Sequence, residues 1–261
     1  MMLEHDGTIR VVRGPRENRH RPSVDPLFRS AAVAAGTEAI AVVLTGSLDD
    51  GTAGMIAIQR AGGTTVVQDP DDAIYASMPR SVVEHIEPDF VLPLRDIPAK
   101  LVELVGKTAP KRRESREDLR RMELEKRITA MDGETLQEDD RPGEPSAFSC
   151  PDCGGVLWEL QDGELTRFRC RVGHAFSPET MLGAQAEELE RALFSALKTL
   201  EESARLSRRL AAAEKSRGHQ WMADRFAERE MDARGRADAI RRFLLRDAGT
   251  TPVEAGAEQT Q

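Results

Sequence analysis

Three cysteines and one histidine stand in two close pairs, Cys150-Pro-Asp-Cys153 and Cys170-Arg-Val-Gly-His174. Two tight turns can bring two such pairs, about sixteen residues apart, around one tetrahedral zinc ion. Because all four positions are protein ligands, none is left open for a water molecule. The pattern therefore indicates a structural zinc site rather than a catalytic one. A redox-active or degenerate cysteine pair is the alternative.

Two adjacent acids, Asp49 and Asp50, precede Gly51 in a turn between a strand-like run over 39–44 and a helical stretch over 52–61. Such a turn falls at the edge of a parallel sheet where open α/β folds place their sites. Asp50 could cap the helix that follows, by accepting hydrogen bonds from its free N–H groups. Alternatively, its carboxylate could orient a histidine, as the acid of a hydrolytic triad does.

A hydrolytic triad also needs a nucleophile and a base, and the sequence offers neither in a recognisable form. It contains no Gly-x-Ser-x-Gly elbow, and Ser47 beside Gly46 lacks the second glycine. His20 is flanked by two arginines, which would make it a poor proton acceptor. The other histidines fall in a metal pair, a predicted helix, a predicted hinge and the start of the chain: His174, His85, His219 and His5.

The elements that must hold these residues can be predicted from the hydrophobic pattern. Up to about residue 105, short apolar runs alternate with amphipathic stretches, which predicts an α/β domain with a parallel sheet over 1–105. The run over 39–44 lacks polar alternation, as expected for a strand buried on both faces. We predict further strands over 64–68 and 89–92, and helices over 23–35, 52–61, 78–86 and 97–105.

Beyond this domain the character of the sequence changes. Residues 106–147 are rich in charge and are predicted to form a linker, and 148–176 are predicted to form a zinc ribbon with two strands around an Asp-Gly turn. Residues 177–247 carry apolar residues at three-to-four spacing on both sides of a break near Gly218. This predicts a helical hairpin, which could also join two copies as a homodimer. Residues 248–261 are predicted to be a disordered tail.

The composition argues against several classes of function. A net charge of -8 disfavours binding to a nucleic-acid backbone, although Arg167, Arg169 and Arg171 lie in the predicted ribbon. No apolar run is long enough to cross a membrane, and the first residues do not form a signal peptide. We therefore predict a cytoplasmic protein without membrane insertion.

Four motifs follow one another in the first ninety residues or so, and together they are specific. They are Gly14-Pro-Arg-Glu-Asn-Arg-His-Arg-Pro-Ser-Val-Asp-Pro-Leu-Phe28, Leu44-Thr-Gly-Ser-Leu-Asp-Asp-Gly-Thr-Ala-Gly54, Ala61-Gly-Gly-Thr-Thr-Val-Val-Gln-Asp69 and Met78-Pro-Arg80. They resemble the C-terminal half of the catalytic domain of the chemotaxis protein-glutamate methylesterase family, CheB. The Cys-Pro-x-Cys-Gly-Gly segment and the helices after it resemble the appendage of CheB-related proteins that lack a receiver domain. The resemblance covers residues 8–105 and 147–246.

This resemblance implies a partial, doubly wound parallel sheet and the hydrolysis of glutamate methyl esters on methylated chemoreceptors by a serine, a histidine and an aspartate. Asp50 matches the family's triad acid, whereas the family's serine and histidine lie upstream of the segment that resembles it. The turn carries Ser47-Leu48 where Met-Gly is common in the family. We therefore expect a truncated chain with no esterase activity by itself and with an exposed apolar sheet edge.

A second interpretation is a non-catalytic interaction protein. In this view the zinc ribbon and the helices bind a partner, and the α/β domain is a remnant. The two interpretations differ in whether a serine and a histidine act together with Asp50.

Overall fold

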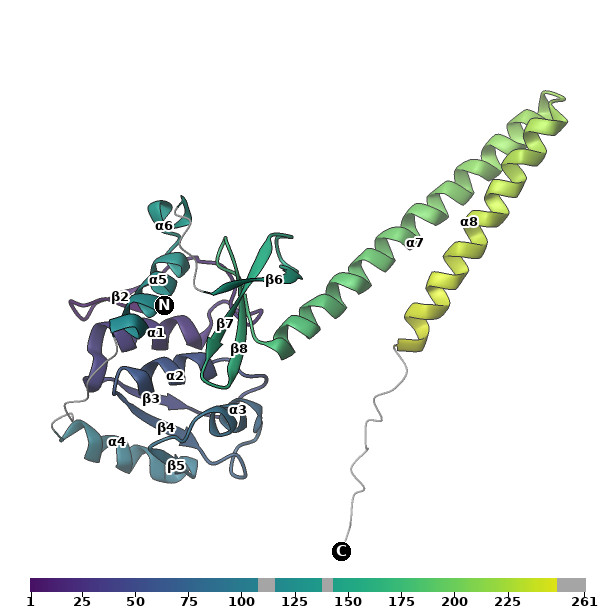
Figure 1. Ribbon diagram of the computed structural model, residues 1–261. Coiled ribbons are helices and arrows are strands. Elements are labelled where there is room, and N and C mark those ends of the chain that lie inside the picture. The colour runs from purple at the N-terminus through teal and green to yellow at the C-terminus, as the bar shows by residue number, and fades with distance from the viewer. Residues whose placement is uncertain (108–115, 138–142, 248–261) are drawn as a thin grey trace, which may run out of the picture. The chain divides into compact units, whose positions relative to one another are not determined.

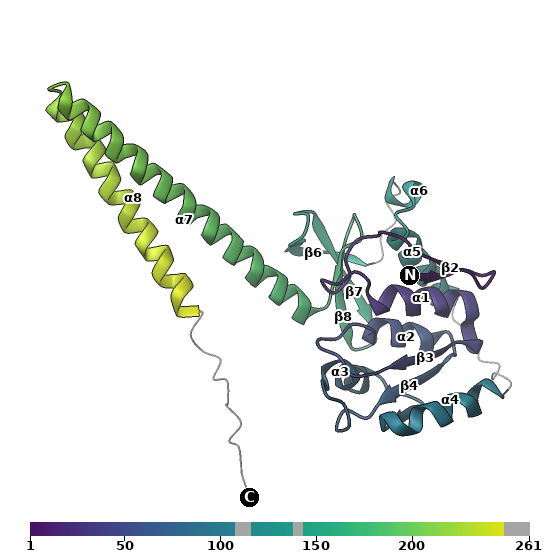
Figure 2. The same ribbon diagram turned by 180° about the vertical axis from the view of Figure 1, so that it is seen from behind.

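The computed structural model describes residues 1–107, 116–137 and 143–247, and it divides into two compact units, residues 1–184 and residues 185–261. Figures 1 and 2 show the ribbon from opposite sides. The predicted tail over 248–261 lies outside the described residues. No helix within the described ranges combines the length and the apolar character that a membrane-spanning helix needs.

A three-stranded parallel sheet forms the centre of the first unit, with the strand order β3-β4-β5. Its strands and the helices around it are β3 (Ile40–Val43), β4 (Thr64–Gln68), β5 (Phe90–Leu92), α1 (Val24–Ala35), α2 (Thr52–Arg60), α3 (Ser77–His85) and α4 (Ile97–Val105). The sequence predicted each of these elements to within one residue at either end. An α/β fold with a parallel sheet is therefore confirmed.

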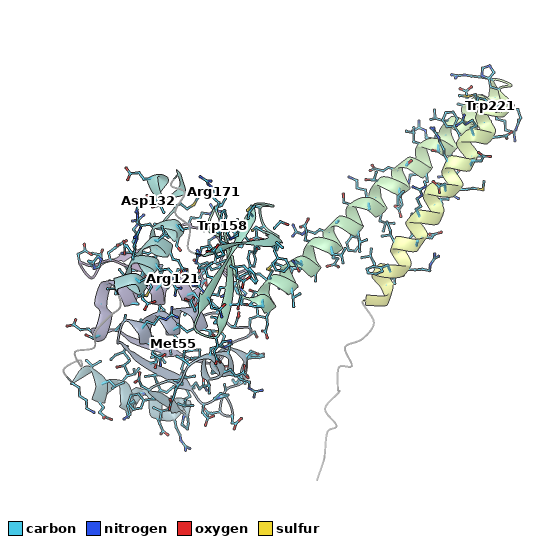
Figure 3. All side chains as sticks on the ribbon, viewed as in Figure 1. Met55, Arg121, Asp132, Trp158, Arg171 and Trp221 are labelled. Carbon is cyan, nitrogen blue, oxygen red and sulfur yellow. The ribbon has the colours of Figure 1, made fainter. Side chains whose placement is uncertain are left out.

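Helices cover both faces of this sheet. Val43 and Val67 are neighbours on one face, because β3 and β4 pair in that register, and they pack against Ala32 of α1 and Met55 of α2. Met55, labelled in Figure 3, is fully enclosed there. In both ribbon views α1 and α2 lie along this side, and α4 lies on the other. Lys100 of α4 stands over the Phe90 ring, 4.7 Å from its centre. Leu44, at the end of the edge strand β3, is exposed.

The segment expected as a linker, 106–147, contains a helix that belongs to the core. This helix, α5 (Arg116–Thr129), places Met122 in the same cluster as the residues under α1, and Leu119 packs against that cluster. Its apolar positions are few, so composition suggested a linker, yet Ile128 of the same helix is also buried, beside Gly173. The unit also contains shorter elements: β1 (Met2–Leu3), β2 (Ile9–Arg10), α6 (Gly133–Gln137) and two single 3₁₀ turns (Gly36–Glu38 and Leu94–Asp96).

A second, antiparallel sheet follows with the order β6-β7-β8-β9. Its strands are β6 (Glu144–Ser149), β7 (Val156–Asp162), β8 (Leu165–Cys170) and β9 (Ala175–Phe176). Leu157, Phe168 and Phe176 form its small core together with Met181 and Ala184, which lie at the start of α7 (Pro178–Ser216). A core of this size is too small to account for the stability of the sheet, so other interactions must contribute.

The second unit is built from most of α7 and from α8 (Gln220–Asp247). Ion pairs from Glu201 to Arg241 and from Glu230 to Arg208, at 2.7 and 3.8 Å, show that the two helices run antiparallel. Trp221, labelled in Figure 3, lies beside the turn that joins them.

The buried face of the two helices carries the three-to-four spacing that the sequence predicts, as at Ala233 and Ala237. Small residues fill the contact, namely Ala204, Ser207, Ala223, Ala233 and Ala237. Leu182 and Leu189 are exposed. Both leucines lie in the first turns of α7.

Candidate functional site

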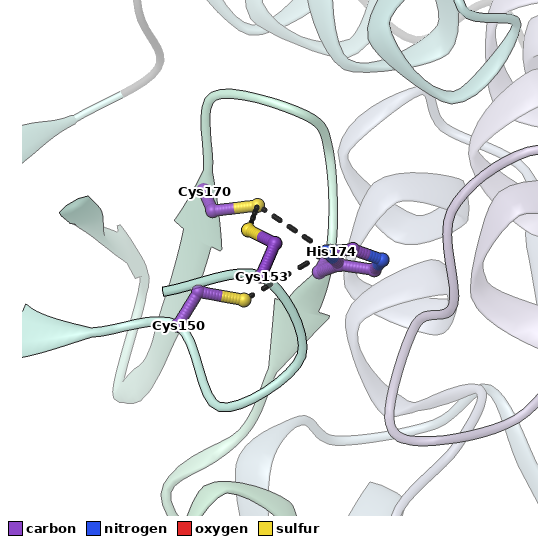
Figure 4. A group of neighbouring side chains, drawn as sticks. All are labelled: Cys150, Cys153, Cys170 and His174. Carbon is purple, nitrogen blue, oxygen red and sulfur yellow. Dashed lines mark hydrogen bonds between the residues drawn. The ribbon is translucent and has the colours of Figure 1, made fainter. Parts of the chain in front are cut away.

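The four predicted metal ligands come together in the second sheet. The donor atoms of Cys150, Cys153, Cys170 and His174 all lie within 4.8 Å of one another (Figure 4). The His174 Nδ1 atom is 3.7 Å from the Cys150 sulfur and 3.6 Å from the Cys170 sulfur, and the Cys153 and Cys170 sulfurs are 3.7 Å apart. Sulfur ligands about 2.3 Å from a tetrahedral zinc ion would be about 3.8 Å apart, so the residues fit zinc.

Two tight backbone turns place these ligands. The Gly154 N–H donates to the Cys150 carbonyl, and the Gly173 N–H donates to the Cys170 carbonyl, at 2.8 and 2.9 Å. Gly173 has a φ of +105°, which residues with a Cβ resist, and a Cβ there would lie 2.7 Å from the Pro15 ring and 2.9 Å from Ile128. This turn is therefore packed against the N-terminal segment and α5.

The electrostatics of the cluster also suit a cation. Hydrogen bonding with the Cys150 thiol and with His174 lowers the pKa of Cys170 to about 3, although the burial of Cys170 acts in the opposite direction. The neighbouring Cys170 sulfur, together with burial, raises the pKa of Cys150. The Asp152 carboxylate lies 3.9 Å from the Nε2 atom of His174, on the side of the ring away from the sulfurs. A carboxylate in that position commonly orients a metal-bound histidine.

Asp50, the predicted catalytic acid, is buried at the carboxyl edge of the parallel sheet. It accepts hydrogen bonds from the Ser23 hydroxyl at 2.6 Å, from the Val24 N–H at 2.8 Å and from the Asp25 N–H at 3.2 Å. These groups form the start of α1, so Asp50 caps that helix and not α2, the helix that follows it in sequence. The prediction that Asp50 caps its own helix is wrong, because the first turn of α1 packs beside the turn that carries it.

Asp25 makes the reciprocal interaction, which the sequence analysis missed. From the first turn of α1, its carboxylate accepts hydrogen bonds from the Gly51 and Gly54 N–H groups at the start of α2, at 3.0 and 2.7 Å. Burial and the neighbouring Asp50 carboxylate raise the pKa of Asp25 to about 7. Each helix thus begins on the carboxylate of the other. The Ser23-Val24-Asp25 pattern at the start of α1 resembles an ordinary capping sequence, so only the packing shows that Asp25 caps another helix.

No histidine among the described residues donates a hydrogen bond to Asp50. His20 is exposed in the loop before α1, where its backbone pairs with Glu17. His85 lies on α3 and contacts the Ser81 carbonyl through Nδ1 at 2.7 Å, and His219 contacts Glu214 beside the turn between α7 and α8. Among the described residues, no histidine is therefore placed to act as a base together with Asp50.

The second sheet is joined directly to the loop that precedes α1. The Asn18 N–H donates to the Ala175 carbonyl at 2.8 Å, and Ala175 directly follows the metal ligand candidate His174. The Asn18 side chain donates to Asp25 at 2.9 Å and accepts from the Ser177 N–H at 3.2 Å. One side chain thus connects the Cys/His sheet with the carboxylate that caps α2.

A buried network of charges lies behind this connection. Arg169 of β8 pairs with Glu17 and with Glu125 of α5, both at 3.0 Å, and Arg29 of α1 pairs with Glu17 at 2.5 Å. Burial by itself would raise the pKa of Glu17 and Glu125, but the surrounding guanidinium groups outweigh it and hold both below their usual range. Arg167 donates two hydrogen bonds to Glu125 at 3.0 Å.

Two of the three arginines considered for nucleic-acid contact are therefore unavailable. Arg167 and Arg169 are buried in ion pairs inside the protein. Their role in this structure is to hold the second sheet against α1 and α5.

Comparisons with known proteins find relatives of the first part of the chain. Residues 1–101 match the model of the family described as CheB methylesterase. A protein-glutamate methylesterase/protein-glutamine glutaminase from Xanthomonas euvesicatoria pv. vesicatoria is 45% identical over 105 residues, which are 39% of this chain and 30% of that protein. A protein of the same description from Bordetella parapertussis is 48% identical over 89 residues, covering 34% of this chain and 25% of its own length.

Among solved structures, the CheB methylesterase catalytic domain of Thermotoga maritima is similar to this chain. It is 42% identical with a TM-score of 0.33, and the match covers 34% of this chain and 47% of that one. The resemblance to CheB methylesterases is confirmed for residues 1–101 by the family and sequence matches. The chain spans less than a third of the length of these two curated relatives.

Proposed function

We propose that residues 1–101 act as part of a protein-glutamate methylesterase in a chemotaxis-type signalling system, with methylated receptors as the substrate. The observation that carries this proposal is the match of these residues to the CheB methylesterase family, with relatives that are 45% and 48% identical. Asp50, which matches the family's triad acid, lies at the carboxyl edge of the sheet, where α/β enzymes place their catalytic groups.

In this proposal the Asp50 carboxylate orients and stabilises an imidazolium during acyl transfer. The groups that donate to Asp50 are the Ser23 hydroxyl and two N–H groups of α1, which fix the position of the carboxylate. The described residues supply neither the histidine nor an activated serine beside it. We therefore expect that this chain by itself releases no methanol from methylated receptors.

The decisive experiment is a chromosomal D50N substitution in the native cell, with receptor methylation measured by mass spectrometry. Loss of the triad acid lowers turnover by about 10⁴-fold in a serine hydrolase, so we expect receptor glutamates to become more heavily methylated. Asp71 is exposed in the loop after β4, and a D71N strain is the matched control. Unchanged methylation in a D50N strain with normal protein abundance would exclude the proposal.

The same variant tests the chain in isolation. Purified wild-type and D50N chains should release methanol from methylated receptor at the same background rate. A faster rate in the wild type would contradict the expected inactivity.

We further propose that Cys150, Cys153, Cys170 and His174 hold a structural zinc ion. The short distances among the four donor atoms and the absence of an open position support this assignment. When bound, zinc would contribute folding free energy to a sheet whose apolar core is small. We also propose that the uncovered first turns of α7 join two copies of the chain, because Leu182 and Leu189 lie seven residues apart on one face.

A further inference from the structure

The four ligand candidates Cys150, Cys153, Cys170 and His174, together the Cys/His cluster, differ in their access to solvent. Cys150 and Cys170 are buried, with 2% of each residue exposed, whereas Cys153 is exposed. Gly154 beside it is also exposed, and a Cβ there would have no atom within 4 Å. A small reagent from solvent can therefore reach the Cys153 residue. Cysteine oxidation favours an exposed thiolate with a second cysteine next to it, and zinc binding keeps its cysteines as thiolates.

The second cysteine in this case is Cys170. Its sulfur lies 3.7 Å from the Cys153 sulfur, and Figure 4 shows the contact between these two atoms. A disulfide bond is about 2.05 Å long, so the two sulfurs need to approach each other by less than about 2 Å. The turn over 151–154 faces solvent at Gly154, so it can make this movement without displacing the core of the sheet.

A disulfide bond between these two cysteines would dismantle the metal site. Structural zinc sites use four protein ligands. A bond between Cys153 and Cys170 removes two of them and leaves Cys150 and His174, so the zinc ion would be released. The sheet would then lack the folding free energy that metal binding supplies to its small apolar core.

The backbone at Cys170 connects the metal site with the loop before α1. The Cys170 N–H donates to the His174 carbonyl at 2.9 Å, and Ala175 follows directly in the chain. Ala175 pairs with the loop twice, because its N–H donates to the Arg16 carbonyl at 3.2 Å and its carbonyl accepts from the Asn18 N–H at 2.8 Å. A rearrangement at the metal site therefore acts on this loop through a short stretch of backbone.

We propose that the Cys/His cluster is a redox switch, in which a hydroperoxide joins Cys153 to Cys170 in a disulfide bond, releases the zinc ion and loosens the loop before α1. The switch rests on the zinc site proposed above, and it does not depend on ester hydrolysis by this chain.

The reaction has two steps, and two electrons pass from the cysteines to the peroxide. The Cys153 thiolate attacks one oxygen of the peroxide, so that an S–O bond forms, the O–O bond breaks and hydroxide or an alkoxide leaves. The Cys170 thiolate then attacks the sulfur of the Cys153 sulfenic acid, so that the S–S bond forms, the S–O bond breaks and hydroxide leaves. Both leaving groups take a proton from solvent and become water or an alcohol.

The first test uses the full-length, zinc-loaded chain, whose zinc content is measured before any oxidant is added. Hydrogen peroxide should then release the zinc ion to a colorimetric indicator, and peptide mapping without reductant should find Cys153 linked to Cys170. Dithiothreitol and zinc together should restore the metal site, because a disulfide is reduced by thiols.

The outcomes of this test separate the zinc site from the switch. A chain that binds no zinc refutes both. A chain that binds zinc and keeps it in hydrogen peroxide refutes the switch alone, and so does a chain in which Cys150 is linked to Cys153 instead.

Variants then assign the reaction to the exposed cysteine. C153H keeps four metal donors, because histidine also binds zinc, but it removes the exposed thiol. Its zinc release in hydrogen peroxide should be at least about tenfold slower than that of the wild type. Val172 is exposed between Cys170 and His174, so V172S is the matched control and should release zinc at the wild-type rate. Release from zinc-loaded C153H as fast as from the wild type would overturn the assignment. If C153H binds no zinc, the peptide map of the wild type decides it.

Hydrogen exchange measures the effect on the loop. In the oxidised chain the amides of residues 16–26 should exchange at least about tenfold faster than in the zinc-loaded chain, with strand β4 as the reference that should not change. Reduction in the presence of zinc should reverse the effect. Unchanged exchange over 16–26 in a chain that has lost its zinc by oxidation would overturn the switch, because the disulfide would then affect the sheet alone.

Discussion

Asp25 and Asp50 exchange hydrogen bonds between the starts of two helices. Each carboxylate accepts backbone N–H groups of the other's helix, where the positive end of the helix dipole stabilises negative charge. The two acids also repel each other, and both are buried. The hydrogen bonds from α1 therefore hold the Asp50 carboxylate in one position, and no histidine is needed for this.

The stability of the protein should depend on pH through Asp25. Folding raises its pKa from the ordinary 3.8 to about 7, mainly through burial and the Asp50 carboxylate. The stabilising contribution is therefore complete below about pH 4, where the unfolded chain is also protonated, and it is lost as the pH rises toward 7. We expect the difference in unfolding free energy between wild type and D25N to fall with a slope of up to about 1.4 kcal/mol per pH unit in this window.

The measurement is urea unfolding at several pH values with saturating zinc, followed by Trp158 fluorescence in a W221F background. D71N, which alters an exposed aspartate, should keep the wild-type pH dependence. Parallel curves for wild type and D25N between pH 4 and 7 would show that Asp25 does not titrate in this way.

At the scale of elements, the second sheet and the α/β layer are held together by more than apolar contact. The Ala175–Asn18 backbone pairing, the Asn18 bridge to Asp25 and the buried pairs of Arg169 all cross between them. Gly173, in the turn between two metal ligand candidates, fits against Pro15 and Ile128 with no room for a Cβ. A change in structure at the Cys/His cluster should therefore also alter the loop before α1.

Removal of the metal should loosen that loop as well as the sheet. We expect one zinc ion per chain, and we expect a chelator to make the amides of residues 150–176 and 16–26 exchange at least about tenfold faster, because the cluster and its pairing with Asn18 are lost together. Hydrogen exchange followed by mass spectrometry measures this, with strand β4 as the internal reference that should not change.

Substitutions separate metal loss from general damage to the sheet. Cys153 is exposed, so C153S removes a ligand at little packing cost and should reproduce the effect of the chelator. Val172 is also exposed and lies in the same region between Cys170 and His174, so V172S is the matched control. Unchanged exchange over residues 16–26 in C153S would show that the two regions are independent.

At the scale of the whole chain, the two units follow different packing rules. The first unit has a conventional core in which branched and aromatic side chains fill the space between layers. The helices of the second unit approach through alanine and serine, which leaves many larger apolar side chains outside. Two of them lie in the first turns of α7, where Leu182 is 67% and Leu189 53% exposed.

We expect the chain to form a dimer through these turns. Light scattering after size-exclusion chromatography should give twice the mass of the 28.8 kDa chain. A charge at the contact would be desolvated on association, so L189E should yield a monomer. Leu206 is an exposed leucine on the part of α7 that α8 covers, and L206E should remain dimeric. A monomeric wild type, or an L189E variant that stays dimeric, would refute this contact.

Local pattern was sufficient to predict most elements of this protein. The apolar run over 39–44 and its successors could only be buried strands between amphipathic helices, and the spacing of Cys150, Cys153, Cys170 and His174 required two turns that face each other. These features depend on neighbours in sequence, and the structure reproduces them with small shifts at the boundaries.

Tertiary packing decided the rest, because it depends on pairs that are far apart in sequence. The sequence does not indicate that Asp50 caps α1 while Asp25 caps α2, since either acid could satisfy the N–H groups nearest to it. The charge-rich segment around Glu125 was predicted to be a linker because charged residues are normally solvated. In the structure Glu125 is buried, since Arg29, Arg167 and Arg169 from two other elements surround it and replace the water.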